Sequence, residues 1–472
     1  MIKLKNHTTP IFLVTFLIAN YANAARISDI DRFQHNDGRL NLYLRGMYIN
    51  TEIKNDAIEK IFGEIPGGHV QGASAVAAIL DYNSPYLSNY IGIDSSLYAV
   101  GKLTSEDSNR QILDDDNSSY AKIGQLFVKA KYHTKNTNTY FQIGRGRFEG
   151  GTIGTRDTRG APDTYEGARI SFDTKNLLLN KPSDELKVSY TYISKSSLLN
   201  EESFNELESL TGNKINSSQS FSIEYDAKIA SLRYGHGYSE DYINRNEAEI
   251  TFRIPLSDDY KNGIMINAQI HKAEAESGIW DTSLDPSNPF KTTDAFDKSS
   301  KLININTGIQ IEGLRIGLSF TKVDAKLTNG KLGYAFLDNA ENVIGSRSMW
   351  TISGSDFNND GEETFQLAAE YNVPGFKISD YHLSGLSLRA VIKKGSFDAD
   401  NPLTGGQKES VNENQQEYRI YYRFDKKDYS GLSVGLSYAK YDIDKDFVAL
   451  VSAQPEAVVS SEEMRVYMDY AF

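Results

Sequence analysis

The feature that most constrains the fold of this chain is an alternation of apolar and polar residues that recurs along nearly its whole length. At the C-terminus every second residue is apolar: Met464, Val466, Met468, Tyr470 and Phe472. Such a period of two places alternate side chains on opposite faces of a β-strand. After residue 24 there is no run of 18 apolar residues that could form a membrane-spanning helix. The pattern therefore predicts an all-β protein.

We count eighteen such segments. They cover residues 39–48, 70–82, 91–102, 120–132, 137–144, 163–173, 184–195, 219–227, 229–237, 246–256, 263–272, 301–311, 312–322, 363–372, 384–394, 416–425, 431–441 and 463–472. The connections after even-numbered segments are mostly short, whereas those after odd-numbered segments are long. Short turns on one rim and long loops on the other are typical of bacterial outer-membrane barrels.

The N-terminus has the pattern of a secretory signal peptide. Lys3 and Lys5 precede the apolar stretch 11–19, and Ala22-Asn23-Ala24 matches a cleavage site. We therefore expect residues 1–24 to be removed and residues 25–472 to form the mature barrel domain in the outer membrane.

The composition narrows the class of protein. A net charge of −13 argues against a nucleic-acid partner. With no cysteine, a long exported chain must be stabilised by size or closure rather than by disulfides. A large secreted β protein and an outer-membrane barrel both fit. In hydrocarbon an open sheet edge is not viable. We therefore expect an 18-stranded antiparallel transmembrane β-barrel, closed by pairing 39–48 with 463–472, around an aqueous lumen.

The same alternation predicts which basic side chains face the inside of the barrel. The first segment turns Leu40, Leu42 and Leu44 to lipid and so predicts inward side chains for Arg39 and Arg45. A lipid-facing arginine near the midplane costs about 2–4 kcal/mol, so inward placement also fits an ordinary polar face. The remaining basic residues predicted to face inward are Arg169, Arg233, Arg253, Arg315, Arg389, Arg419, Arg423, Arg465, Lys129, Lys131 and Lys187.

We predict a basic lumen wall made of Arg39, Arg45, Arg169, Arg315, Arg389, Arg419 and Arg423. Few inward positions near mid-height are expected to be acidic, because the acidic runs lie in the long connections. A positive wall in a narrow tube attracts carboxylate or phosphate groups.

One long connection is unusually rich in glycine and arginine. Residues 144–167 hold seven glycines and four arginines. The glycines permit the positive φ values of a tight fold. If the segment folds inward, its charged residues would line a constriction: Arg145, Arg147, Arg156, Asp157, Arg159 and Asp163. A solvated surface loop is the alternative.

Several stretches of the N-terminal third resemble a known family, among them GRLNLYLRGMY (38–48) and LDYNSPYLSNYIGID (80–94). AKIGQLFVKAKY (121–132), followed by Asp157-Thr158-Arg159 and by Thr164-Tyr165-Glu166-Gly167-Ala168, resembles the OprD-type family of substrate-specific outer-membrane porins. The resemblance implies an eighteen-stranded barrel, a constriction from the third long loop, and an arginine ladder that steers carboxylates or, in some members, short sugars. Asp157 and Arg159 match the family motif, whereas Thr158 departs from its serine.

Signals for enzymes and metals are weak. Residues 431–435 match G-x-S-x-G, but the alternation continues where a hydrolase needs a sharp turn and a helix. The segment that starts at Asp356 begins like a calcium loop, yet its twelfth position is Leu367 rather than glutamate. An unpaired acidic loop, a weak calcium site and contact with cation-bridged lipopolysaccharide all remain open. We expect no enzyme activity, no cofactor and no metal.

The function predicted is a passive, moderately selective outer-membrane channel for small carboxylate-bearing nutrients. The alternatives are an oligosaccharide-selective, chitoporin-like channel of the same family, an outer-membrane adhesin, and a soluble secreted β protein. Expected partners are outer-membrane lipid and lipopolysaccharide, small solutes, and the barrel-assembly machinery through Phe472. Either a monomer or a homotrimer fits the sequence.

Overall fold

The computed structural model describes residues 38–53, 70–106, 109, 111–175, 184–208, 214–257, 262–276, 299–324, 357, 359–374, 377–378, 381–382, 385–401, 407–424, 431–444 and 460–472. The expected signal peptide lies outside these residues.

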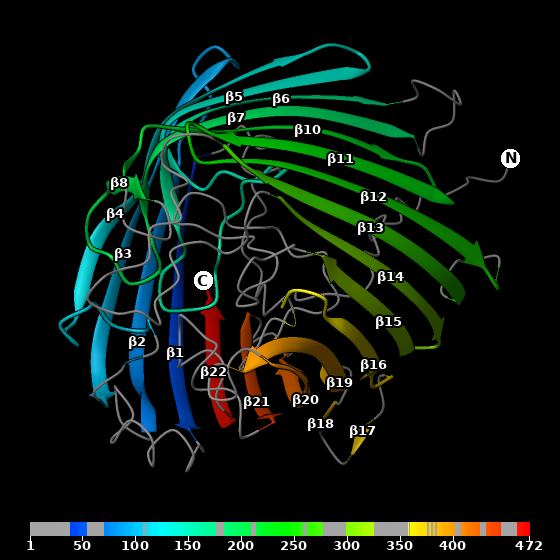
Figure 1. Cartoon of the computed structure of the whole chain (residues 1–472). Coiled ribbons are helices and arrows are strands. Elements are labelled where there is room, and N and C mark those ends of the chain that lie inside the picture. The colour runs from blue at the N-terminus through cyan, green and yellow to red at the C-terminus, as the bar shows by residue number, and fades with distance from the viewer. Residues whose placement is uncertain are drawn as a thin grey trace, which may run out of the picture.

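Eighteen long strands form the body of the protein (Figure 1). They are β1 (Arg39–Ile53), β2 (Val70–Asn83), β3 (Ile91–Ser105), β4 (Tyr120–His133), β5 (Thr137–Gly146), β6 (Thr164–Lys175), β7 (Glu185–Ser197), β10 (Ser218–Asp226), β11 (Ala230–Ser239), β12 (Ile243–Pro255), β13 (Gly263–Ala275), β14 (Ser299–Ile311), β15 (Leu314–Asp324), β16 (Glu363–Asn372), β19 (Leu386–Asn401), β20 (Gln407–Arg423), β21 (Leu432–Ile443) and β22 (Ser461–Ala471). Each of the eighteen predicted segments coincides with one of them, which confirms the strand prediction.

Four short strands lie in the connections. The pair β8 (Asn205–Glu208) and β9 (Lys214–Ile215) lies between β7 and β10. The hairpin of β17 (Lys377–Ile378) and β18 (Tyr381–His382) lies between β16 and β19.

The barrel is closed by its two terminal strands. The first and last strands pair antiparallel from Tyr43 opposite Ala471 to Ile53 opposite Ser461, and they lie side by side in Figure 1. The predicted closure is therefore confirmed, and it leaves neither strand as an unpaired edge.

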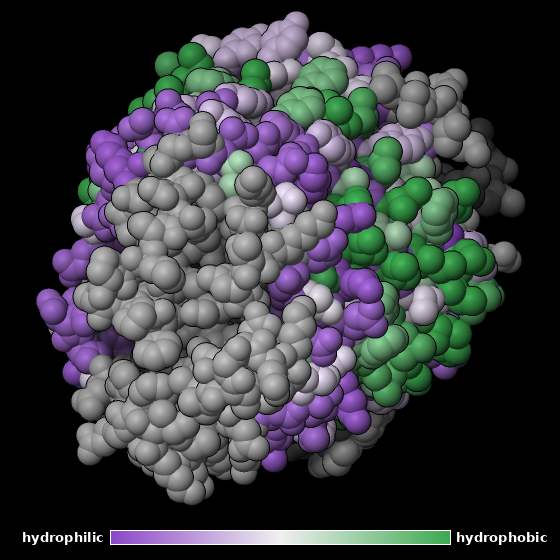
Figure 2. Space-filling model, in the orientation of Figure 1, coloured by the Kyte–Doolittle hydropathy of each residue, from purple (hydrophilic) through white to green (hydrophobic). Residues whose placement is uncertain are grey.

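The two faces of the sheet differ as the alternation predicts. On the outer face, apolar side chains such as Ile305, Leu318 and Phe365 are exposed. Figure 2 shows hydrophobic side chains gathered over β12–β16, at the right of the view. The inner face of these strands carries buried polar side chains, among them Asn304 and Thr321. Within the described residues, no helix is long and apolar enough to cross a membrane.

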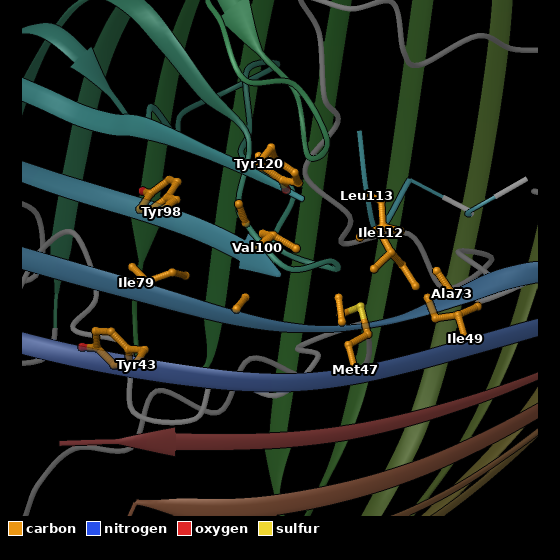
Figure 3. Packing of buried hydrophobic residues seen from close by; sticks show 13 residues of the cluster. Tyr43, Met47, Ile49, Ala73, Ile79, Tyr98, Val100, Ile112, Leu113 and Tyr120 are labelled. Atoms are coloured by element: carbon orange, nitrogen blue, oxygen red, sulfur yellow. The ribbon is translucent and has the colours of Figure 1, made fainter. Parts of the chain in front are cut away.

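Two apolar clusters join connecting segments to the inner face. One holds inward side chains of β1–β4 together with Ile112, Leu113 and Ala161 from two long connections (Figure 3). The other holds Phe148 and Ile153 together with side chains from β6–β9 and β12–β15. Parts of the long connections therefore pack against the barrel's inner face.

Candidate solute path

Several inward arginines lie along one line across neighbouring strands. Arg315 of β15 is opposite Glu370 of β16, which is opposite Arg389 of β19. Arg389 is in turn opposite Arg419 of β20. The line continues through Ser437 of β21 to Arg465 of β22. Directly opposed residues in an antiparallel sheet point to the same face, so these side chains share the inner face.

This line climbs along the barrel. Neighbouring strands are about 4.8 Å apart, and strands in outer-membrane barrels tilt by roughly 40°, so a row of opposed residues rises by ~3 Å per strand. Five steps from β15 to β22 thus amount to a rise of about 15 Å. The arginines form an inclined row rather than a ring at one height.

Most of these arginines have acidic neighbours. Arg315 Nη1 lies 3.4 Å from Glu370 Oε1, and Arg419 Nη2 lies 3.0 Å from Glu417 Oε1. Arg465 forms an ion pair with Glu463. Other inward basic groups are paired as well: Arg233 with Glu224, Arg253 with Asp226, Lys129 with Asp94, and Lys187 with Glu185. The expectation that few inward positions near mid-height are acidic is corrected by Glu417 and Glu463, which lie within β20 and β22. Acidic and basic residues share the same face.

Three predicted wall arginines differ from this pattern. Among the described residues, Arg169, Arg389 and Arg423 have no ion pair or side-chain hydrogen-bond partner. Arg423 lies opposite Ser433 near the end of β20 that leads into the short turn. The predicted wall residue Arg39 lies opposite Asn83, at the rim of the barrel that carries the short turns.

The segment 147–163, the third long connection, contacts the inner face of β1–β3. Arg45 of β1 donates from Nε to Asp469 Oδ1 of β22 at 2.6 Å. Its Nη1 donates to Asp157 Oδ1 at 3.0 Å and to the carbonyl oxygen of Arg159 at 2.6 Å. A Cβ on Gly160 would lie 2.9 Å from Val100 Cγ2, so this part of the segment packs tightly on the strands.

The same segment also contacts β10–β12. The backbone N–H of Thr152 donates to Ser220 Oγ at 2.9 Å. Arg245 Nη2 donates to the carbonyl oxygen of Thr152 at 2.7 Å. Gly237 leaves room for Thr152, because a Cβ there would lie 2.0 Å from Thr152 Oγ1. Gly151 adopts φ of +57°, a conformation that favours glycine.

Two ion pairs lie within the segment itself. Arg156 Nε donates to Asp163 Oδ2 at 2.7 Å, and Asp163 is fully buried. Burial opposes the charge on Arg156, but the attraction and hydrogen bond of Asp163, together with Tyr165 and Glu201, outweigh this effect, so the pKa of Arg156 is raised. Arg147 Nη2 lies 3.6 Å from Glu149 Oε1. Arg159 Nη1 donates to the carbonyl oxygen of Thr158 at 3.0 Å.

The register corrects the expectation for Arg145. This residue lies on β5 rather than in a loop, opposite Leu126 and Glu166. It has the same parity as the exposed residue Ile143, and Leu126 is exposed too. Arg145 therefore belongs to the outer face, where it lies 3.3 Å from Glu166 Oε2 and over the ring of Phe204. The reason is that β5 extends to Gly146, two residues beyond the predicted strand.

Two residues of this region were missed from sequence. Arg245 lies one position before the predicted segment 246–256, so it was not sorted by alternation. Asp469 has the same parity as Arg465, but its role depends on the closing register, which places it opposite Arg45.

The remaining motifs do not form a reaction centre. Ser433 of the G-x-S-x-G match is buried within the regular strand β21. The calcium-like segment falls partly outside the described residues, since Asp356 and Asn358 are not among them. Within the described part of the chain, no cluster of metal-ligating residues is present.

A closed barrel of eighteen antiparallel strands, apolar outside and charged inside, is the architecture of a large outer-membrane protein. The family described as "outer membrane porin, OprD family" matches residues 34–472. The chain therefore belongs to the OprD family of outer-membrane porins, which are channels rather than enzymes. Residence among outer-membrane lipids and the passage of small solutes follow from this membership. No curated protein matches the chain.

Solved porin structures share the fold. OccAB3 of Acinetobacter baumannii is 18% identical with a TM-score of 0.69, covering 92% of this chain and 99% of that one. OccAB1 of the same organism is 15% identical with a TM-score of 0.71, covering 92% and 96%. OpdK of Pseudomonas aeruginosa, solved with vanillate, is 17% identical with a TM-score of 0.66, covering 92% and 98%.

Proposed function

We propose that this porin is a passive channel for small carboxylate-bearing nutrients and carries out no chemical reaction. The observation that carries the proposal is a set of inward arginines that form no ion pair or side-chain hydrogen bond within the described residues: Arg169, Arg389 and Arg423. A guanidinium that makes no direct ion pair can replace part of the hydration of a passing carboxylate. The vanillate in the OpdK structure is a carboxylate of this kind.

We propose further that segment 147–163 folds inward and narrows the path. Its contacts with Arg45 on one side and with Ser220 and Arg245 on the other support this. Arg156, Asp157 and Arg159 would then surround the constriction, with Arg147 at its edge, and the buried Asp163 would hold Arg156 in place.

A channel for short sugars is the second candidate. It is favoured by a belt of amide side chains on β13 and β14. Asn306 Nδ2 donates to Asn267 Oδ1 at 2.8 Å and to Asn304 Oδ1 at 2.6 Å. Amide groups in rows suit hydroxyl-rich solutes, because they offer both donors and acceptors.

The remaining expectations belong to the same proposal. Residues 1–24 would serve as the export signal. Phe472 is exposed and packs against Tyr470, and its N–H bonds to the carbonyl oxygen of Leu42, which leaves the ring available to the barrel-assembly machinery. We propose contact with lipopolysaccharide at the outer leaflet, and either a monomer or a homotrimer is compatible with the barrel.

The test is uptake into proteoliposomes of solute pairs that match in shape and differ in charge. Benzoate and benzamide form one pair, and glucuronate and glucose form another. The proposal predicts that each carboxylate enters faster than its uncharged partner. Glucose and longer sugars entering faster than both carboxylates would favour the sugar channel. Equal rates for all four solutes would refute carboxylate preference.

A further inference from the structure

We propose that Arg45 and Arg245 are positioning residues that hold segment 147–163 across the barrel and thereby set the width of the constriction. This inference rests on the proposed inward fold of the segment. It removes Arg45 from the basic wall and gives a role to Arg245, which the sequence pattern did not single out.

The two arginines use the same type of contact. Each donates from its guanidinium to a backbone carbonyl of the segment, Arg45 to that of Arg159 at 2.6 Å and Arg245 to that of Thr152 at 2.7 Å. Their exposed fractions are only 7% and 2%. A hydrogen bond from a charged donor in a buried place is stronger than a neutral one. Each contact therefore ties the main chain of the segment to the wall.

The two arginines stand on opposite sides of the barrel. From β1 through β2–β7, β10 and β11 to β12 there are nine steps between neighbouring strands, half of an eighteen-stranded circumference. Strands about 4.8 Å apart and tilted by roughly 40° give a diameter on the order of 36 Å.

The length of the segment shows what long side chains add. The seven steps from Thr152 to Arg159 span at most ~25 Å when fully extended. This is shorter than the barrel is wide. The segment itself contacts β3 and β10, which are five strand steps apart, and the two arginines reach it from β1 and β12, which are nine steps apart. Arginine has the length and several donors on one planar group. The segment would therefore be a strap between two opposite anchors.

The charge of Arg45 is already offset. Its guanidinium contacts the carboxylates of Asp469 and Asp157, and those two side chains are about as buried as its own. A group in that position attracts a passing anion less than Arg389, which forms no ion pair within the described residues. Arg45 thus differs in role from the arginines of the proposed path.

The test compares charge-conserving variants in planar-bilayer recordings with polyethylene glycols of graded size. Arg45→Lys and Arg245→Lys keep the charge but lose the planar array of donors. We expect both to admit larger polymers and to raise open-channel noise, because losing one such bond raises the share of displaced strap roughly 10- to 100-fold. Their reversal potentials should stay at the wild-type value.

Arg389→Gln is the matched control, since it should shift the reversal potential and leave the polymer cut-off unchanged. Heat-modifiable mobility in gels checks that each variant forms its barrel. If Arg45→Lys does not, Asp157→Ala removes the other strap contact of Arg45, its bond to the Asp157 carboxylate, and must show a wider cut-off as well. Wild-type cut-off and noise in the folded variants would overturn the strap. An unchanged reversal potential in Arg389→Gln would instead contradict the proposed anion path. The positioning role of Arg45 and Arg245 would not be affected by that result.

Discussion

Removing the charge of Arg389 should weaken anion preference by an amount that depends strongly on salt. An ion passing within ~5 Å of a unit charge gains or loses about 0.8 kcal/mol in water. Arg389→Gln therefore lowers the attraction of a monovalent anion and the repulsion of a monovalent cation by that amount each. With screening, the anion-to-cation permeability ratio should fall about tenfold at 0.01 M salt and less than twofold at 1 M.

The assay is the reversal potential across a planar bilayer with a salt gradient, repeated at several ionic strengths. The double variant Arg419→Gln/Glu417→Gln is a suitable control, because it removes an ion pair on the same row without changing net charge. It should leave the ratio near the wild-type value. The reasoning fails if Arg389→Gln leaves the ratio unchanged at 0.01 M, or if the control shifts it equally.

Two further predictions concern the two faces of the sheet. Leu318→Arg, on the exposed outer face of β15, should cost about 2–4 kcal/mol of folding free energy in lipid vesicles, whereas Ser319→Arg on the inner face should cost much less; equal costs in a urea titration would contradict the assigned orientation. Gly160→Ala should increase channel noise, since its Cβ would lie 2.9 Å from Val100 Cγ2, and adding Val100→Ala should restore the quiet channel. Noise that persists in the double variant would show that Gly160 matters for another reason.

The strands and the orientation of their side chains were predictable from the sequence. Lipid on one face and water on the other impose an alternation of apolar and polar residues on every strand. The charge balance of the inner face was partly predictable as well. Glu417 and Arg419 lie two positions apart on one strand, so they share a face without any knowledge of register. The pair between Arg45 and Asp469 differs, because it depends on which residues meet where the barrel closes. Alternation within one strand carries no information on that register.

The placement of Arg145 shows how boundaries limit such reasoning. Counted as a loop residue, it seemed free to point anywhere. Counted as part of β5, it must point outward with Ile143. A shift of two residues in one strand end was enough to move a charged residue from the proposed path to the outer rim.

The proposed strap gives a physical reason for the alanine-rich composition of β2. Strand β2 is rich in alanine, and Ala73, Ala75 and Ala77 all face inward, where larger side chains would be the rule for a strand that fills its own interior. Ala77 lies in the row that contains Arg45 and Val100, and a Cβ on Gly160 would meet its side chain at 3.5 Å. Small residues on the wall make room for main chain to approach, and Arg45 beside them binds that main chain. The small inward side chains of β2 are therefore what the close packing of segment 147–163 on this strand requires.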